Sequence, residues 1–201
     1  MFLESCDLSY IYAPLALPHE KIIITNSKKV RSAVDERYHE RRAECEQALR
    51  ELQTVIAIRD LGELTAEVFE KVQEMIESPV RLRRARHAVT ENQRTIQAVE
   101  ALKRGDIFEF GQLMNASHLS LKEDYEVSCE ELDILVEEAW DIDGVLGSRM
   151  MGAGFGGCTV SIVENSAVSE FISRVGQNYE KRTGLHAEFY VVETGNGASV
   201  L

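Results

Sequence analysis

The sequence has few prolines and no long apolar run, and each shortage excludes a class of protein. With 3 prolines and 44% hydrophobic residues in 201, the composition is that of a globular chain and not of a fibrous or disordered one. No apolar segment approaches the roughly 20 residues of a membrane-spanning helix. The N-terminal residues also lack the basic and apolar regions of a signal peptide. We therefore expect a cytoplasmic protein with no membrane partner.

Cysteine is scarce too, and no metal site is predicted. The four cysteines lie far apart and form no C-x-x-C pair: Cys6, Cys45, Cys129 and Cys158. That spacing argues against a zinc site and is typical of reduced, mostly buried thiols. Asp141 and Asp143 offer carboxylates, but they are predicted to lie in a turn at a helix end and not to bind Mg²⁺.

Positive charge is the third shortage. The chain has 22 Lys and Arg against 34 Asp and Glu, which gives a net charge of -12. An acidic chain repels phosphate backbones, so nucleic acid is excluded as a primary partner. A bound phosphate would need local groups such as backbone amides, Mg²⁺ or a few basic side chains. The one basic cluster, Arg81–His87, has helical spacing and is predicted to be a solvated helix face.

The predicted strands lie near the two ends of the chain, and the middle is helical. Extended or strand segments are expected at 2–8, 9–17, 21–26, 158–163 and 187–194, and helices at 30–52, 65–76, 80–103, 107–116, from 128 and at 166–183. The front strands must then pair with the tail strands over a long separation. This pattern predicts an α+β fold, with a small, largely antiparallel sheet and helices packed on one face.

Several local signals set the expected helix boundaries. The first long helix carries one apolar stripe: Val30, Val34, Tyr38, Cys45, Leu49 and Leu52. Thr65 is a predicted N-cap, and Ser78 with Pro79 is a predicted helix start. Residues 118–127 break the periodicity and are predicted to form a loop, after which Ser128 and Glu131 form a predicted capping box.

The segment Gly147–Gly157, GSRMMGAGFGG, carries the most chemical content. Its glycines satisfy G-x-G-x-x-G, but they run into a strand and not a helix, so a dinucleotide site is excluded. There is no GK[ST], so it is not a P-loop either. Glycines allow positive φ and close backbone approach. From the residues alone, a tight turn before a strand and a ligand-binding loop both remain open.

The same segment carries a resemblance to a known family. Residues 147–163, GSRMMGAGFGGCTVSIV, are very similar to the third signature motif of galactokinases, which belong to the GHMP kinase superfamily. Residues 113–139 resemble that family's loop-and-helix block, and residues 24–49 resemble its strand-to-helix segment. The resemblance follows the family's order and covers essentially the whole chain.

This resemblance implies a fold and a domain assignment. Residues 1–201 would form the C-terminal domain of a galactokinase, a ferredoxin-like α+β fold with a helical insertion. The family's sugar-binding motif, ATP-phosphate loop and catalytic aspartate lie in an N-terminal half and have no counterpart here. Met1 also falls inside a predicted strand, so we expect more protein to precede it.

The resemblance also implies site residues, none of them catalytic and none a metal ligand. Tyr38 lies where the family has its galactose-contacting tyrosine, although periodicity alone favours a core aromatic on the helix stripe. An active-site loop is implied at Gly152, Ala153, Gly154, Phe155, Gly156 and Gly157. Met150, Met151 and Phe155 are expected to pack beneath this loop, and Arg149 is expected to form a structural salt bridge.

One other polar cluster invites a catalytic interpretation. His118, Ser120 and Asp124 suggest a Ser-His-Asp nucleophile, with Tyr125 beside them. We reject this hypothesis because there is no G-x-S-x-G elbow, and because the matching family block has no such role. A hydrogen-bonded loop near the cleft is expected instead.

The implied function is that of the parent protein and not of this chain alone. A galactokinase transfers the γ-phosphoryl group of ATP, with Mg²⁺, to the anomeric hydroxyl of D-galactose. The chain alone is expected to be inactive, to hold no tightly bound cofactor and to self-associate through an exposed interdomain surface. Two alternatives stay open: a related sugar kinase with a different substrate, and a non-catalytic galactose-sensing homologue.

Overall fold

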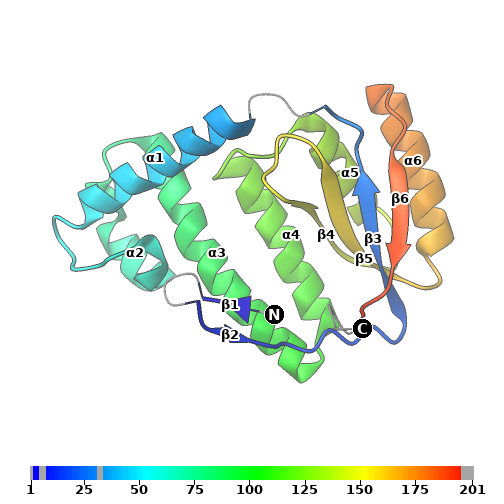
Figure 1. Ribbon diagram of the computed structural model, residues 1–201, viewed down its shortest axis with the longest axis horizontal. Coiled ribbons are helices and arrows are strands. Elements are labelled where there is room, and N and C mark those ends of the chain that lie inside the picture. The colour runs from blue at the N-terminus through cyan, green and yellow to red at the C-terminus, as the bar shows by residue number, and fades with distance from the viewer. Residues whose placement is uncertain (1, 5–7, 31–33, 196–201) are drawn as a thin grey trace, which may run out of the picture.

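The computed structural model describes residues 2–4, 8–30 and 34–195. A four-stranded antiparallel sheet joins the front of the chain to its tail, in the order β4-β5-β3-β6 (Figure 1). Its strands are β3 (Glu20–Asn26), β4 (Val145–Met151), β5 (Cys158–Glu164) and β6 (Glu188–Val192). The predicted pairing of front and tail strands is confirmed.

Strand β3 holds the sheet together because it has a partner on each side. It pairs with β5 from Glu20↔Glu164 to Asn26↔Cys158, and with β6 from Ile22↔Val192 to Asn26↔Glu188. Its run of three isoleucines suits a pleated surface that is covered on one side. The alternation follows: Ile23 is fully buried, while the residues on either side of it are half-buried.

Two helices cover one face of this sheet. They are α5 (Glu130–Trp140) and α6 (Val168–Thr183), and Figure 1 shows α6 running alongside β6 and β3. Ile23 meets Leu135 of α5 and Phe171 of α6 in one buried cluster. Tyr179 of α6 is also fully buried, and its hydroxyl donates a hydrogen bond of 2.7 Å to the carbonyl of Ser27. The predicted α+β fold is therefore confirmed, with α5 and α6 packed on one sheet face.

The helical part lies beside the sheet and has its own core. Its helices are α1 (Val34–Leu52), α2 (Ala66–Val72), α3 (Pro79–Arg104) and α4 (Ile107–Glu123), with 3₁₀ turns at Leu61–Glu63 and Gln73–Met75. In Figure 1, α4 lies between α3 and the sheet, and α1 crosses α3. Ala48, Leu52, Phe69, Ala85 and Val89 are among the buried residues that hold these helices together.

The predicted starts of α2 and α3 are confirmed. The Thr65 hydroxyl accepts a hydrogen bond from the Val68 amide at 3.2 Å, and Ser78 accepts one from the Arg81 amide at 3.5 Å. Pro79 occupies the first turn of α3. Each oxygen satisfies a backbone N–H that has no partner inside the helix.

Two predictions about residues 118–131 are wrong. Helix α4 continues to Glu123, because His118, Ser120 and Leu121 are buried against neighbouring elements whose contacts the sequence pattern does not show. The predicted capping box is also absent. Helix α5 begins after Cys129, which makes no side-chain cap, and the Ser128 hydroxyl instead donates to the Asp133 carboxylate at 2.5 Å.

The predicted stripe of α1 holds only for the second half of that helix. Leu52 is fully buried, but Tyr38 is 53% exposed and Val30, which precedes the helix, is 82% exposed. The Val34 side chain lies outside the described part of the structure. The first turns of α1 therefore extend away from the core that its last turns enter.

The prediction that Arg81–His87 is a solvated face is also wrong. Arg84 is 1% exposed and bonds the Glu44 carboxylate, the Glu126 carboxylate and the Asp124 carbonyl. The carboxylates of Glu44 on α1 and of Glu126 in the loop after α4 supply the counter-charge that a buried guanidinium requires. The cluster therefore ties α1, α3 and the loop after α4 together.

The N-terminal segment forms a small hairpin. Strands β1 (Phe2–Leu3) and β2 (Tyr10–Ile11) pair antiparallel, near α3 in Figure 1. They are far shorter than the extended segments predicted there. Met1 and Cys6 lie outside the described residues, whereas Cys45, Cys129 and Cys158 are free thiols.

Helix α4 and strand β4 approach each other unusually closely at two glycines. A Cβ placed on Gly111 would lie 2.3 Å from the Leu146 carbonyl oxygen, and one placed on Gly147 would lie 2.3 Å from the Gly111 carbonyl oxygen. No side chain can occupy either position without moving backbone. This contact sets the distance between the helical part and the sheet.

We predict that Gly111→Ala destabilises the chain by about 1–3 kcal/mol in urea unfolding, because its methyl group overpacks a backbone contact. Alanine favours a helix over glycine by about 1 kcal/mol, so helix propensity alone would stabilise the variant. A loss of stability would therefore come from the close backbone contact. Gly176→Ala in α6 is the matched control, since its nearest neighbour is the tip of the Phe189 ring at 3.2 Å. Equal stability of the two variants would contradict the interpretation.

Candidate functional site

The glycine-rich loop and Tyr38 meet at one small pocket. This pocket of about 160 Å³ is lined by Tyr38, Arg41, Leu121, Tyr125, Val127, Gly152, Ala153 and Phe155. Its walls come from α1, α4, the loop after α4 and the loop between β4 and β5. The structure thus brings together the two features that the sequence analysis singled out, although more than a hundred residues separate them.

The loop from Gly152 to Gly157 has a backbone that few sequences can adopt. Gly152, Gly154, Gly156 and Gly157 have φ of 77°, 87°, 113° and 100°, and Phe155 has φ of 54°. Glycine takes these angles without a Cβ clash, but a phenylalanine in this region costs about 1–3 kcal/mol. Such strain persists only where surrounding contacts hold it in place.

Val127 is the main contact that holds the loop. The Phe155 amide donates a hydrogen bond of 2.7 Å to the Val127 carbonyl. A Cβ on Gly154 would lie 2.1 Å from that same carbonyl oxygen, so only glycine fits. The Phe155 side chain packs with Leu121, Val127, Leu132 and Met150, as the sequence analysis expected for Phe155 and Met150.

The loop is also attached to the segment that leads into α1. The Ser27 amide, just after β3, donates to the Gly157 carbonyl at 2.9 Å. The Lys29 side chain packs at 3.0 Å from the place of a Cβ on Gly156. On α1 itself, the Arg37 guanidinium lies 4.9 Å from the centre of the Phe155 ring, within cation–π range. These contacts place the first turns of α1 beside the loop.

Tyr38 is not a core aromatic, so the interpretation from periodicity is wrong at this position. With 53% of its surface exposed, it sits on the rim of the pocket and presents a flat aromatic face and a hydroxyl. This combination suits a ligand with one apolar face and hydroxyl groups at its edge.

Arg41 is the charged residue among the described residues that line the pocket, whereas the wall at Tyr125 is uncharged. The Tyr125 ring stacks on His87 with ring centres 4.5 Å apart. Burial, with a contact to Cys45, raises the pKa of Tyr125, and burial raises the pKa of the Cys45 thiol. Both groups are therefore protonated near neutral pH and present no charge to a ligand.

The polar cluster at 118–125 divides into two separate networks. The Ser120 hydroxyl donates to Asp124 at 3.0 Å and lies 2.9 Å from His87 Nδ1, so its histidine partner is His87 and not His118. Here serine stands between histidine and carboxylate, and it is 6% exposed. A nucleophilic triad requires histidine in the middle and an accessible serine. The rejection of that hypothesis agrees with the geometry, although the sequence analysis missed His87.

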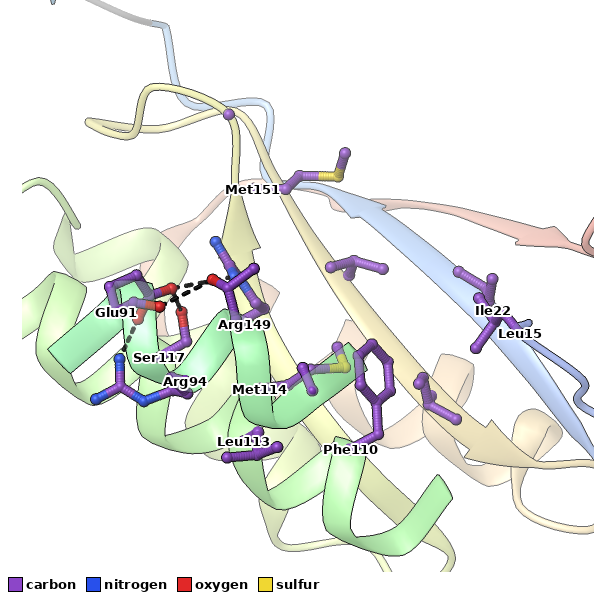
Figure 2. Close-up of a pocket in the computed structure, with 15 residues that line it drawn as sticks. Leu15, Ile22, Glu91, Arg94, Phe110, Leu113, Met114, Ser117, Arg149 and Met151 are labelled. Atoms are coloured by element: carbon purple, nitrogen blue, oxygen red, sulfur yellow. Dashed lines mark hydrogen bonds and ion pairs between the residues drawn. The ribbon is translucent and has the colours of Figure 1, made fainter. Parts of the chain in front are cut away.

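A larger pocket of about 380 Å³ lies between α3, α4 and the sheet face opposite α5 and α6 (Figure 2). Leu15, Ile22, Phe110, Leu113 and Met114 supply much of its apolar wall. Met151 also lines it and is 37% exposed, so the expectation that Met151 packs beneath the loop is wrong. Gly152 lines both pockets, which makes the loop the partition between them.

Charged groups close one end of this larger pocket. Glu91 pairs with Arg94, accepts a hydrogen bond of 2.5 Å from Ser117 and lies 3.6 Å from Arg149 (Figure 2). The ion pair of Arg149 agrees with the structural salt bridge expected from the sequence. Arg149 is thus held by a carboxylate and is not aimed at the small pocket.

Two searches of the described residues give further limits. Within 2–4, 8–30 and 34–195, no group of three or more His, Cys, Asp or Glu side chains could hold a metal ion. Asp141 and Asp143 lie in the turn after α5, as predicted. Over those same ranges, no helix combines the length and the apolar composition that crossing a membrane requires.

Sequence comparisons with known proteins find one family of kinases. A family described as GHMP kinases C terminal matches residues 98–181. A galactokinase of Fusobacterium nucleatum is 52% identical over 199 residues, covering 98% of this chain and 51% of the relative. One from Clostridium acetobutylicum is 51% identical over 198 residues, with 98% and 51% covered.

Solved structures give the same result. A Lactococcus lactis galactokinase complexed with galactose matches with a TM-score of 0.94 at 45% identity, covering 99% of this chain and 51% of that one. An L. major mevalonate kinase matches with a TM-score of 0.53 at 21% identity, covering 86% and 41%, and shares the fold alone.

Fold and sequence together define the chain as a C-terminal domain of the GHMP kinase type. Within that superfamily the chain belongs to the galactokinase family. It spans about half the length of the curated relatives it matches, 51% of the first two.

We predict that protonation of His87 weakens the fold as the pH falls. Burial lowers the pKa of His87 from 6.5 to about 4. The unfolded chain therefore binds this proton more tightly, so stability is full above about pH 6.5 and declines toward about pH 4. Between about pH 7 and about pH 5 the loss is about 2 kcal/mol. Urea unfolding of His87→Gln should lack this loss, whereas His186→Gln, at an exposed histidine, should keep it.

We also predict that Gly154→Ala costs more stability than Gly184→Ala. Both glycines have positive φ, 87° and 72°, so both variants bear the backbone cost of about 1–2 kcal/mol. Only Gly154 faces a carbonyl at 2.1 Å, while nothing lies within 4 Å of a Cβ on Gly184. Urea unfolding should show an additional loss of about 1–3 kcal/mol for Gly154→Ala. Equal losses would mean that Val127 does not hold the loop.

Proposed function

We propose that residues 1–201 are the C-terminal domain of a galactokinase. The parent protein transfers the γ-phosphoryl group of ATP to the anomeric hydroxyl of D-galactose, and this chain supplies one wall of the cleft. The observation that carries the proposal is the pocket shared by Tyr38 and the Gly152–Phe155 loop. Support comes from the galactokinase complexed with galactose, whose fold this chain matches with a TM-score of 0.94.

The chain's own residues bind and orient the substrate. The exposed ring of Tyr38 offers an apolar face against which a sugar ring can stack. The glycines beside it leave backbone free of Cβ atoms, so a hydroxyl or a phosphoryl oxygen can approach the amides closely. Within the part of the chain that the structure describes, the pocket is lined by Arg41 and by no carboxylate, so no negative charge of its lining faces the transferred phosphate.

The groups that act on ATP belong to the other half of the parent protein in this proposal. In this proposal Mg²⁺ enters as part of the MgATP substrate. The base that takes the proton from the anomeric hydroxyl is likewise assigned to the other half. The work of this chain is to position the sugar and to exclude water.

The chain alone is therefore expected to turn over no galactose. We further propose that the parent protein acts in the cytoplasm and that the isolated chain self-associates. The apolar wall around Phe110 and Leu113 supports the last expectation, because a surface of this kind favours burial against a partner. Sedimentation of the purified chain measures it, and a strictly monomeric chain at high concentration would contradict it.

The proposal is tested by restoring the missing half. The N-terminal half of the Lactococcus lactis enzyme, fused to residues 1–201, should release ADP from MgATP in the presence of galactose. Tyr38→Ala in that fusion should raise the galactose KM about tenfold, the equivalent of about 1.4 kcal/mol of lost stacking. Tyr190→Ala is the matched control, since Tyr190 is 49% exposed on β6 and outside the pocket.

Each alternative predicts a different outcome of this experiment. A folded fusion that phosphorylates another sugar in preference to galactose would indicate a related sugar kinase. A fusion that binds galactose without releasing ADP would favour a non-catalytic sensor. Either result would contradict the galactokinase proposal, and turnover by the chain alone would contradict the assignment of the base to the other half.

A further inference from the structure

Strand β4 is an edge strand, and helix α4 covers its free side. The Ser148 amide donates to Asn115 Oδ1 at 2.8 Å, and the Met150 amide donates to His118 Nδ1 at 3.2 Å. Ser148 and Met150 are alternate residues, so both N–H groups point to the side of β4 that has no partner strand. Two side chains of a helix thus replace the backbone carbonyls of a missing strand.

This arrangement requires the close contact between the two elements. Asn115 and His118 are three residues apart on one helix face, a rise of about 4.5 Å, while alternate strand residues are about 6.6 Å apart. Side chains as short as Asn and His bridge this difference only because Gly111 and Gly147 bring the backbones together. A free strand edge with unpaired N–H groups ordinarily invites pairing with another chain. Here the N–H groups of Ser148 and Met150 are hydrogen-bonded without a further strand.

The surroundings of His118 determine which of its nitrogens carries the proton. Nδ1 accepts from the Met150 amide, so the proton of the neutral ring is on Nε2. Nε2 lies 3.4 Å from Asp133 Oδ1. Burial alone would raise the pKa of Asp133, but the nearby His118 ring and a hydrogen bond from Ser128 lower it below its usual value. The resulting carboxylate favours the tautomer that leaves Nδ1 free to accept.

Met150 connects this contact to the active-site loop. Its side chain is fully buried in the cluster that contains Phe155 and Val127. Its methyl carbon lies 3.1 Å from the place of a Cβ on Gly154. The backbone of Met150 is thus fixed by His118, while its side chain packs under the centre of the loop.

We propose that His118 is a positioning residue: acting through the backbone of Met150, it holds the Gly152–Gly157 loop in the conformation that faces Tyr38. His118 touches no substrate in this proposal, since it is 1% exposed. As a role in a reaction the inference rests on the galactokinase proposal, but the positioning of the loop can be measured without it.

The first measurement uses the purified chain and nitrogen-15 NMR. In the wild type, the ring proton of His118 should be on Nε2 and not on Nδ1. His118→Leu removes the acceptor at similar volume and should speed amide exchange by at least about tenfold at Met150 and at Phe155, whose amides donate to His118 and to Val127 in the wild type. His118→Asn keeps an acceptor near the place of Nδ1 and should stay within about threefold of the wild type at the same amides.

A matched control separates positioning from a general loss of stability. Phe69→Leu removes volume from the helical core, where Phe69 is 2% exposed, and costs about 1 kcal/mol or more without touching β4. In Phe69→Leu, the ratio of the exchange rate of the loop amides to that of the Ile23 amide in the central strand should equal the wild-type ratio. Equal acceleration at the loop in His118→Leu and Phe69→Leu would overturn the proposal. A wild-type His118 ring with its proton on Nδ1 would also overturn the proposal. This second outcome is measured on the wild-type chain, so it does not depend on whether any variant folds.

The second measurement uses the same variants in the fusion with the Lactococcus lactis half. A misplaced loop should lower kcat/KM for galactose by at least about tenfold in His118→Leu, chiefly through kcat because Tyr38 is unchanged. His118→Asn and Phe69→Leu should stay near the wild type. A loop that moves with no change in kcat/KM would overturn the role in the reaction. An inactive wild-type fusion, with exchange as expected, would sink the galactokinase proposal and leave the positioning of the loop standing.

Discussion

The fold depends on one pairing, that of strand β3 with both β5 and β6. Residues 20–26 lie near the front of the chain, and their partners lie at 158–164 and 188–192. The entropy of closing so long a loop must be repaid by the buried face that includes Ile23. Once β3 is in place, the segment after it passes the glycine loop, where the Ser27 amide bonds the Gly157 carbonyl. Tyr38 reaches the pocket only because this pairing brings α1 there.

The glycine loop shows how a local sequence acquires its shape from distant contacts. Its glycines can adopt positive φ, but they can equally adopt other backbone angles, so they do not by themselves specify one conformation. Selection comes from Val127, whose carbonyl binds the Phe155 amide and leaves no space for a Cβ at Gly154. The two interpretations left open by the residues alone are therefore compatible. The segment is a tight turn held against Val127, and the same turn is the wall of a pocket.

Predictions from sequence succeeded where the cause was local. The Thr65 and Ser78 caps, strands β3, β5 and β6, and helix α6 follow from hydroxyl chemistry, β-branching and periodicity within a few residues. They failed where a partner from elsewhere decided the outcome. Residues 118–123 are helical where His118 accepts a hydrogen bond from the Met150 amide of β4, and Arg84 is buried because Glu44 and Glu126 surround it. Tyr38 fits the apolar period of α1, yet it is exposed because the core contacts only the later turns of that helix.

The sequence by itself determined the fold class, the family and the glycine loop as the segment to examine, since these follow from patterns and motifs contained in short stretches. It also named Tyr38, but only through resemblance to that family. The tertiary structure alone decided that Tyr38 and the loop share a pocket, that His87 and not His118 pairs with Ser120, and that His118 supports β4. The physical reason is that hydrogen bonds and packing act over a few ångströms, and the groups that meet here are far apart along the chain.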